Sequence, residues 1–168
     1  MRNHPFIFGV SILVIALAFI FRDRIAELEH LGLLGIMLIN FFGSATLFFP
    51  APGIATVVAG GALYSPIAVA VVSSFGATLG EIVGFLLGHS SKNLFYKKHH
   101  TTFLIINDLF HTFGGILIFL VALIPNPVFD AVGILAGFFH YPLMRFFVII
   151  FVARFIRNFL LASLGSAF

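Results

Sequence analysis

Long apolar runs follow one another along nearly all of this 168-residue chain, and they constrain its fold more than any other feature. A helix that crosses the hydrocarbon core of a bilayer needs about 20 apolar residues. Of all residues, 61% are hydrophobic and only 9% are charged, whereas a soluble domain carries about a quarter charged residues. The sequence therefore predicts an all-α integral membrane protein that crosses the bilayer several times.

The first apolar run, residues 5–21, follows Arg2 and is expected to be a retained membrane helix rather than a cleaved signal peptide. The charged stretch after it, residues 22–30, is too polar for the hydrocarbon core and is predicted to lie in the interface. Residues 1–30 thus form an N-terminal unit of one transmembrane helix and one interfacial segment.

Two Pro-x-Pro stretches interrupt later apolar runs. Proline removes a backbone donor and breaks a helix, which at membrane depth is tolerated only beside protein or a water-filled cavity. We therefore predict a re-entrant helical hairpin at each break, and leave open two full spans for residues 31–63. The break residues are Pro50, Pro52, Gly53, Pro125, Asn126 and Pro127.

An internal repeat links the two breaks, with matching residues 75 to 77 positions apart. The matched elements are Pro50-x-Pro52 with Pro125-x-Pro127, Ala59-Gly60 with Ala136-Gly137, Tyr64 with Tyr141, Pro66 with Pro142, and Gly88 with Gly165. Each repeat, residues 31–89 and 113–168, is read as a hairpin followed by a spanning helix, with a polar basic linker over residues 90–112. Broken helices in matching positions are typical of transporters, although a duplicated packing unit would give the same pattern.

Lysine and arginine indicate the orientation of the repeats. If both hairpins are re-entrant, the N-terminus and the 90–112 linker lie on one side, which then holds Arg2, Lys92, Lys97 and Lys98. The positive-inside rule places that side in the cytoplasm. The second hairpin then enters from the opposite face to the first, so the predicted repeat is inverted.

Two acidic residues within the apolar runs are candidates for proton or ion coupling. Glu81 lies 15 residues after Pro66, inside a predicted span, and Asp130 follows the second break by three residues. A charge at the centre of a membrane helix costs about 2.5 to 3.5 kcal/mol, so such groups tend to be paired and to mark a transport pathway. The alternative for Glu81 is an ion pair that serves only packing.

Three polar residues share one face of the last span and are candidates for binding an anionic headgroup: Arg154, Arg157 and Asn158. Arg157 lies 15 residues after Pro142, at the depth that Glu81 has in the first repeat. The alternative is that Arg157 extends its side chain to the interface near the C-terminal end.

Other site classes lack support in the sequence. Four glycines recur every fourth residue from Gly76 to Gly88 and predict a close helix contact. The histidines of the linker have no carboxylate nearby except Asp108, so no metal site is expected, and no cofactor motif, protease motif or nucleic-acid-binding pattern is found. We expect a protein that is not an enzyme.

The motifs around both breaks resemble the DedA family, also called the SNARE-associated or VTT-domain superfamily. The resemblance rests on residues 49–53, Ala59-Gly60, and the Gly-Ala-x-Leu-Gly-acid pattern that ends at Glu81, and in the second half on residues 124–130 with Ala136-Gly137. It covers roughly residues 31 to 165. Family members that look proton-coupled carry acids beside the first break, where this chain has Asn40 and Ile54, and an arginine-rich stretch at the second break is missing here.

The resemblance implies two inverted re-entrant hairpins in a prokaryotic plasma (inner) membrane, with Glu81 and Asp130 at the family's acidic positions. It also implies movement of phospholipid or polyprenyl-phosphate lipids between leaflets, by scrambling or by proton-linked translocation. Membrane lipids are the expected partners, and a homo-oligomer is left open. The competing hypotheses are a proton-coupled transporter of a small soluble solute and a structural or partner-binding membrane protein.

Overall fold

The computed structural model describes residue 9 and residues 31–46, 52–95, 100–124 and 128–167. Within these ranges every regular element of more than one turn is a helix, and no strand occurs. The helices are α3 (Leu33–Ala45), α4 (Pro52–Leu63), α5 (Pro66–Phe95), α6 (His100–Leu123), α7 (Val128–Phe138) and α8 (Leu143–Gly165). The predicted helix at 5–21, the interfacial segment and the break residues Pro50, Pro125, Asn126 and Pro127 lie outside the described residues.

Proline marks the start of three helices. Pro52 and Pro66 are the first residues of α4 and α5, and Pro142 is the N-cap of α8. The first turn of a helix suits proline because its missing N–H has no partner there and its fixed φ already matches the helix. Both Pro-x-Pro stretches fall between two helices, so the predicted interruptions of the helical runs are confirmed.

Two helices are long and apolar enough to cross a membrane, Pro66–Ser90 within α5 and Leu143–Gly165. The apolar helices α3, α4 and α7 have 13, 12 and 11 residues, or about 20 Å or less at 1.5 Å per residue. The polar stretch over residues 90–112 is mostly helical, because α5 continues to Phe95 and α6 already begins at His100.

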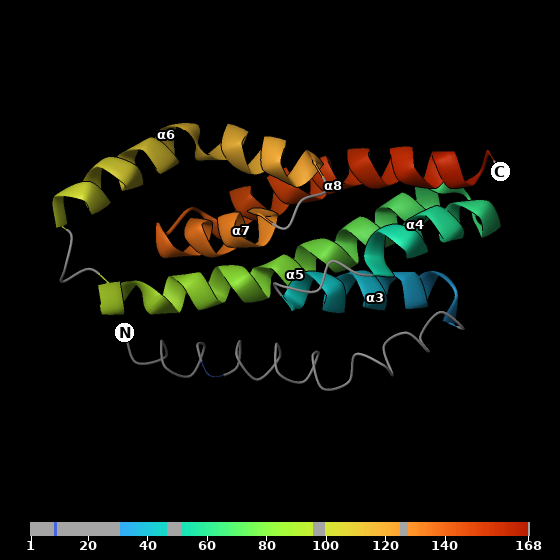
Figure 1. Ribbon diagram of the computed structural model, residues 1–168, viewed down its shortest axis with the longest axis horizontal. Coiled ribbons are helices and arrows are strands. Elements are labelled where there is room, and N and C mark those ends of the chain that lie inside the picture. Colours follow the sequence, from blue (N-terminus) through green and yellow to red (C-terminus); the bar gives the residue numbers. More distant parts are fainter. Residues whose placement is uncertain (1–8, 10–30, 47–51, 96–99, 125–127, 168) are drawn as a thin grey trace.

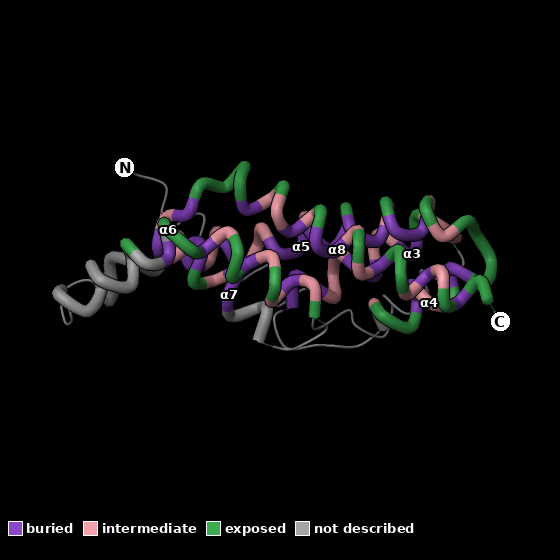
Figure 2. Tube along the Cα trace, turned by 90° about the horizontal axis from the view of Figure 1, so that it is seen from above, coloured by how far each residue is buried: buried purple, intermediate pink, exposed green. Residues whose placement is uncertain are grey.

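The two long helices α5 and α8 cross near the middle of the molecule, with α3 and α4 towards one end and α6 and α7 towards the other (Figure 1). Helices α3 and α7 pack on α5, whereas α4 and α6 pack on α8. In addition α3 contacts α4, and α6 contacts α7. Buried residues lie along the facing sides of the helices, and exposed residues line the outside (Figure 2).

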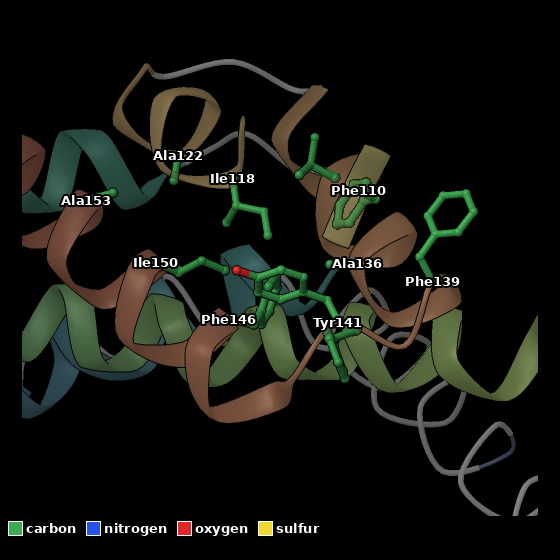
Figure 3. Close-up of a cluster of buried hydrophobic side chains, with 11 residues drawn as sticks. Phe110, Ile118, Ala122, Ala136, Phe139, Tyr141, Phe146, Ile150 and Ala153 are labelled. Atoms are coloured by element: carbon green, nitrogen blue, oxygen red, sulfur yellow. The ribbon is translucent and has the colours of Figure 1, made fainter. Parts of the chain in front are cut away.

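The larger hydrophobic cluster joins α6, α7 and α8 to the second part of α5 (Figure 3). Its ring contacts include Phe85 with Phe146, whose centroids are 4.8 Å apart. Its members are Phe85, Phe110, Ile118, Ala122, Val132, Ala136, Phe139, Tyr141, Phe146, Ile150 and Ala153. A smaller cluster of Ile36, Val57, Val69 and Ala162 joins α3, α4, α5 and α8.

Glycines bring backbones together where α7 crosses α5 and where α4 crosses α8. A Cβ added to Gly88 of α5 would lie 1.9 Å from the Ile134 carbonyl oxygen of α7, and one added to Gly137 would lie 1.8 Å from the Phe85 oxygen. Only glycine permits such an approach. The same reciprocal arrangement joins α4 to α8, with Gly61 against the Ala162 oxygen and Gly165 against the Val58 oxygen, at 2.0 and 1.9 Å.

The predicted glycine face of α5 is confirmed by its contacts with α3. A Cβ at Gly76 would lie 2.1 Å from the Met37 oxygen, and one at Gly80 would lie 2.3 Å from the Phe41 oxygen. One detail of the repeat differs from the sequence alignment, which matched Gly60 with Gly137. The residue that makes the equivalent backbone contact is Gly61, because the crossing requires the glycine that faces α8.

Candidate functional site

Glu81 lies at the centre of the molecule and is fully buried, at 0% exposure. It belongs to α5, where Gly80 lets α3 approach on one side and leaves Glu81 to face α8. From α8 the Arg154 guanidinium donates a hydrogen bond to Glu81 Oε1 and forms a buried ion pair with it. A buried carboxylate is costly unless a cation compensates its charge, and Arg154 supplies that cation.

Asn158 makes the second polar contact between α5 and α8. Its Nδ2 donates to Ser73 Oγ at 2.9 Å and to Ser74 Oγ at 3.1 Å, and all three residues are fully buried. Asn158 follows Arg154 by four residues, one turn further along the same face of α8. The helices therefore cross over two polar contacts, an ion pair and a branched hydrogen bond.

Arg157 lies beside this crossing but is less buried than Arg154. Its Nε and one terminal nitrogen donate to Asn158 Oδ1 at 3.2 and 3.1 Å. Asn158 thus accepts from Arg157 while it donates to the serines, which fixes the orientation of its amide. The half-buried guanidinium of Arg157 makes no ion pair with a carboxylate among the described residues.

Helix α7 closes the site at Gly133. A Cβ at this position would lie 3.2 Å from Glu81 Oε2 and 3.7 Å from the Phe146 ring, so the glycine leaves room for the carboxylate. Asp130 lies in the first turn of α7, three residues before Gly133, and its side chain is outside what the structure describes. At 1.5 Å per residue, its backbone is about one helical turn from the Glu81 contact.

A separate polar contact closes the first break, away from Glu81. Asn40 of α3 donates to the Ile36 oxygen at 2.8 Å and to Thr56 Oγ1 of α4 at 3.4 Å. Thr56 in turn donates to the Gly53 oxygen at 2.9 Å, and a Cβ at Gly53 would lie 3.1 Å from Asn40 Oδ1. Asn40, which stands near the first break where related proteins have an acid, therefore joins the two limbs at this break.

The structure brings together four of the five predicted polar residues: Glu81, Arg154, Arg157 and Asn158. Glu81 pairs with Arg154 rather than with Arg157, the residue at matching distance from the repeat's proline. Sequence reasoning missed Ser73, Ser74 and Gly133. The spacing of seven residues from Ser74 to Glu81 places both on one face of α5 and could have predicted the serine, whereas nothing marks Gly133 in the sequence.

The charges of the site leave a positive excess. Glu81 contributes one negative charge, and Arg154 and Arg157 contribute two positive charges, of which one is neutralised by the ion pair. Such a site favours an anionic group, and guanidinium groups bind phosphate through paired hydrogen bonds. In the part of the chain that the structure describes, no three histidine or acidic side chains gather as metal ligands.

A comparison with known protein families matches residues 49–167 to the VTT domain. The matched segment contains α4 to α8 and every residue of the polar crossing. No curated protein and no solved structure matches the chain.

Proposed function

Because this chain belongs to the VTT-domain family, the membrane-associated DedA and SNARE-associated proteins, we propose that it moves lipids between the leaflets of a bilayer. The observation that carries the proposal is the buried Glu81–Arg154 pair, located where two helices long enough to span a membrane cross. Ionisable groups inside membrane helices are costly and tend to line the path of a charged cargo.

We further propose that α3 to α5 and α6 to α8 are inverted repeats, each with a re-entrant hairpin. Exchanging the halves converts the α3–α5 contact into α6–α8, and the α5–α7 contact into α8–α4, and both members of each pair are present. The tyrosines support the same exchange. A Cβ at Gly32 would lie 2.8 Å from the Tyr64 hydroxyl oxygen, and one at Gly115 would lie 3.0 Å from that of Tyr141.

The short helices support re-entrant limbs rather than full spans. The hydrocarbon core is about 30 Å thick, whereas α3, α4 and α7 each extend for about 20 Å or less. Limbs of this length end inside the membrane and bring polar backbone groups of the breaks to that depth. We propose a multi-pass protein of a prokaryotic plasma membrane with its N-terminus in the cytoplasm, as the distribution of lysine and arginine predicts.

In this proposal Arg157 is the residue that first contacts a lipid phosphate. Its guanidinium is half-buried and held by Asn158, whereas the guanidinium of Arg154 is already paired with Glu81. An incoming phosphate can compete with Glu81 for Arg154, and protonation of the released carboxylate would remove its charge. Glu81, with Asp130 one turn from Gly133 on α7, is the proposed point of proton coupling.

The test is leaflet exchange of a head-labelled phospholipid in proteoliposomes, measured by quenching of the outer leaflet. Quenching beyond half of the label by the wild type is the expected result. Arg157→Gln is expected to slow the exchange by at least tenfold, because it removes the charge and leaves the amide able to contact Asn158. The matched control is Arg145→Gln, which removes an exposed arginine from the first turn of the same helix.

The outcomes separate the hypotheses. Equal rates in Arg157→Gln and Arg145→Gln would contradict the assignment of Arg157, even if lipid moves. Quenching that stops at half would contradict lipid scrambling. Uptake of a soluble solute that collapses with the proton gradient would then identify the chain as a solute transporter, and no flux of either kind would favour a structural or partner-binding role.

A further inference from the structure

His140, between α7 and α8, has a backbone conformation that histidine rarely adopts. Its φ of 56° is the only positive φ among the described residues other than glycine. The amide of Tyr141 donates to the Ala136 oxygen at 2.9 Å, and that of His140 donates to the Gly137 oxygen at 3.0 Å. This is the Schellman pattern that ends a helix, and its left-handed position is usually a glycine. A side chain here opposes the backbone preference, which suggests that the side chain itself is needed.

The ring of His140 lies against that of His89, near the end of the apolar part of α5. Their centroids are 4.2 Å apart with the planes at 45°. His140 Nδ1 is 3.1 Å from the Phe138 oxygen, and because a carbonyl only accepts, Nδ1 carries the hydrogen. His89 is stacked on Phe85 of its own helix, with centroids 6.3 Å apart. The two imidazoles are thus held together from both sides.

The first half has no such contact. The residue that corresponds to His140 at an offset of 77 is Leu63, the last residue of α4. Tyr64 after it donates to the Gly60 oxygen at 2.8 Å, which is the ordinary helical bond, and no positive φ is needed. The repeat therefore does not require the left-handed residue, and the histidine pair is a feature of the second half alone.

We propose that the His89–His140 contact is a pH-sensitive latch that holds the α7–α8 turn on α5 and releases it when both rings are protonated. Imidazole takes up its proton near neutral pH, at about pH 6.5 when free in water. Two adjacent positive rings repel each other, so the closed latch binds fewer protons than the open one. Its stabilising effect is present above about pH 6.5 and is lost as the pH falls below that value.

The neighbouring charges do not compensate for a second proton. On α5 the nearest described acid is Glu81, about two turns away and paired with Arg154. The described side chains of α7 carry no charge, and Asp108 of α6 and Arg145 of α8 are exposed. Tyr141 in the turn is buried and packs against Phe110 of α6, with ring centroids 6.0 Å apart. The inference does not depend on the cargo of the protein.

The experiment is thermal unfolding of the full chain in lipid nanodiscs at about pH 7.5 and about pH 5. The variants are His89→Phe, which keeps a stacking ring, His140→Asn, which tolerates a left-handed backbone, and the double variant. We expect the unfolding midpoint of the wild type to fall on acidification by about 5 °C more than that of any variant. Both single variants should show the same smaller fall as the double, since either removes the whole latch.

A second measurement uses the absence of cysteine from the chain. A single cysteine replaces buried Phe139 in the turn or, in a reference protein, exposed Met144 at the start of α8. The ratio of their labelling rates is expected to rise severalfold at the lower pH and to stay constant in the His89→Phe background. A constant ratio in the wild-type background, or equal acid sensitivity of the unfolding midpoint in all four proteins, would overturn the latch.

Discussion

The α3–α4–α5 half buries polar side chains where the α6–α7–α8 half buries aromatic and aliphatic ones. Among the described residues, the buried polar side chains of the first half are Asn40, Ser44, Thr46, Thr56, Ser73, Ser74, Thr78 and Glu81, and those of the second half are Arg154 and Asn158. The larger apolar cluster takes ten of its eleven members from the second half. The repeat thus retains its helix contacts while the chemistry that fills them differs.

The difference teaches that equivalent backbones can be stabilised in two ways. Lipid tails are as apolar as leucine, so apolar burial between membrane helices stabilises mainly through close fit. The second half obtains this fit with rings, as in the Phe85–Phe146 and Phe110–Phe139 contacts. The first half instead uses glycines on α5 and hydrogen bonds from Asn40, with Glu81 and Ser73 turned towards the other half.

The largest effect is expected from breaking the ion pair between the halves. Glu81→Ala leaves the buried Arg154 guanidinium without its carboxylate, and it should lower the free energy of unfolding by about 3 to 5 kcal/mol. Unfolding in mixed SDS micelles measures this. The double variant Glu81→Leu with Arg154→Leu should be more stable than Glu81→Ala, and a double variant that is less stable would show that the pair is not held as described.

The glycine crossings should give the next largest effect and an equal one in both halves. Gly137→Ala and Gly61→Ala each place a Cβ within 2.0 Å of a carbonyl oxygen, so the helices must separate. A loss of about 2 to 3 kcal/mol in the free energy of unfolding is expected for each. If only one of the two substitutions destabilises the protein, the crossings are not equivalent.

Loss of a polar contact should cost less. Asn40→Leu removes the hydrogen bond from α3 to Thr56, and Asn158→Leu removes those to Ser73 and Ser74. Hydrogen bonds between membrane helices contribute about 0.6 kcal/mol on average and up to about 1.7 kcal/mol, so both variants should unfold more easily by about that amount. A stabilising effect of Asn40→Leu would contradict the view that the first half depends on polar contacts.

The smallest effects distinguish two glycines in the first limbs of the halves. A Cβ at Gly43 of α3 meets nothing within 4 Å, so Gly43→Ala should stabilise the protein by about 0.5 to 1 kcal/mol through helix propensity. A Cβ at Gly115 of α6 would lie 3.0 Å from the Tyr141 hydroxyl oxygen, and Gly115→Ala should lose that gain. Thermal unfolding of the two variants side by side provides the comparison.

Much of the helix arrangement follows from proline, glycine and apolar length. The prolines predicted where α4, α5 and α8 begin, and the glycine spacing on α5 predicted its contact with α3. The partner of Glu81 was not predictable from residue counts. In an antiparallel crossing, residues at matching depth meet only at the crossing point, and the glycines that set this point are on other pairs of helices.

The candidate site was predicted less completely than the fold. Charge and amide groups in an apolar run identified Glu81, Arg154 and Asn158, because such groups are rare there. Gly133 acts by leaving space for a carboxylate from another helix, and His140 acts through a left-handed turn. Neither property depends on local sequence alone, since each is defined by a helix that is distant along the chain.

The close packing described for α5 and α8 divides the chain in an unusual order. Helices α3 and α7 are fitted to α5 through glycines, α4 is fitted to α8 in the same way, and α6 packs on α8. Successive helices therefore belong alternately to two groups, and each connection from α3 to α8 passes from one group to the other, like a lace between two edges. If one group shifted against the other, both Pro-x-Pro connections would be displaced at once, so neither hairpin could open alone.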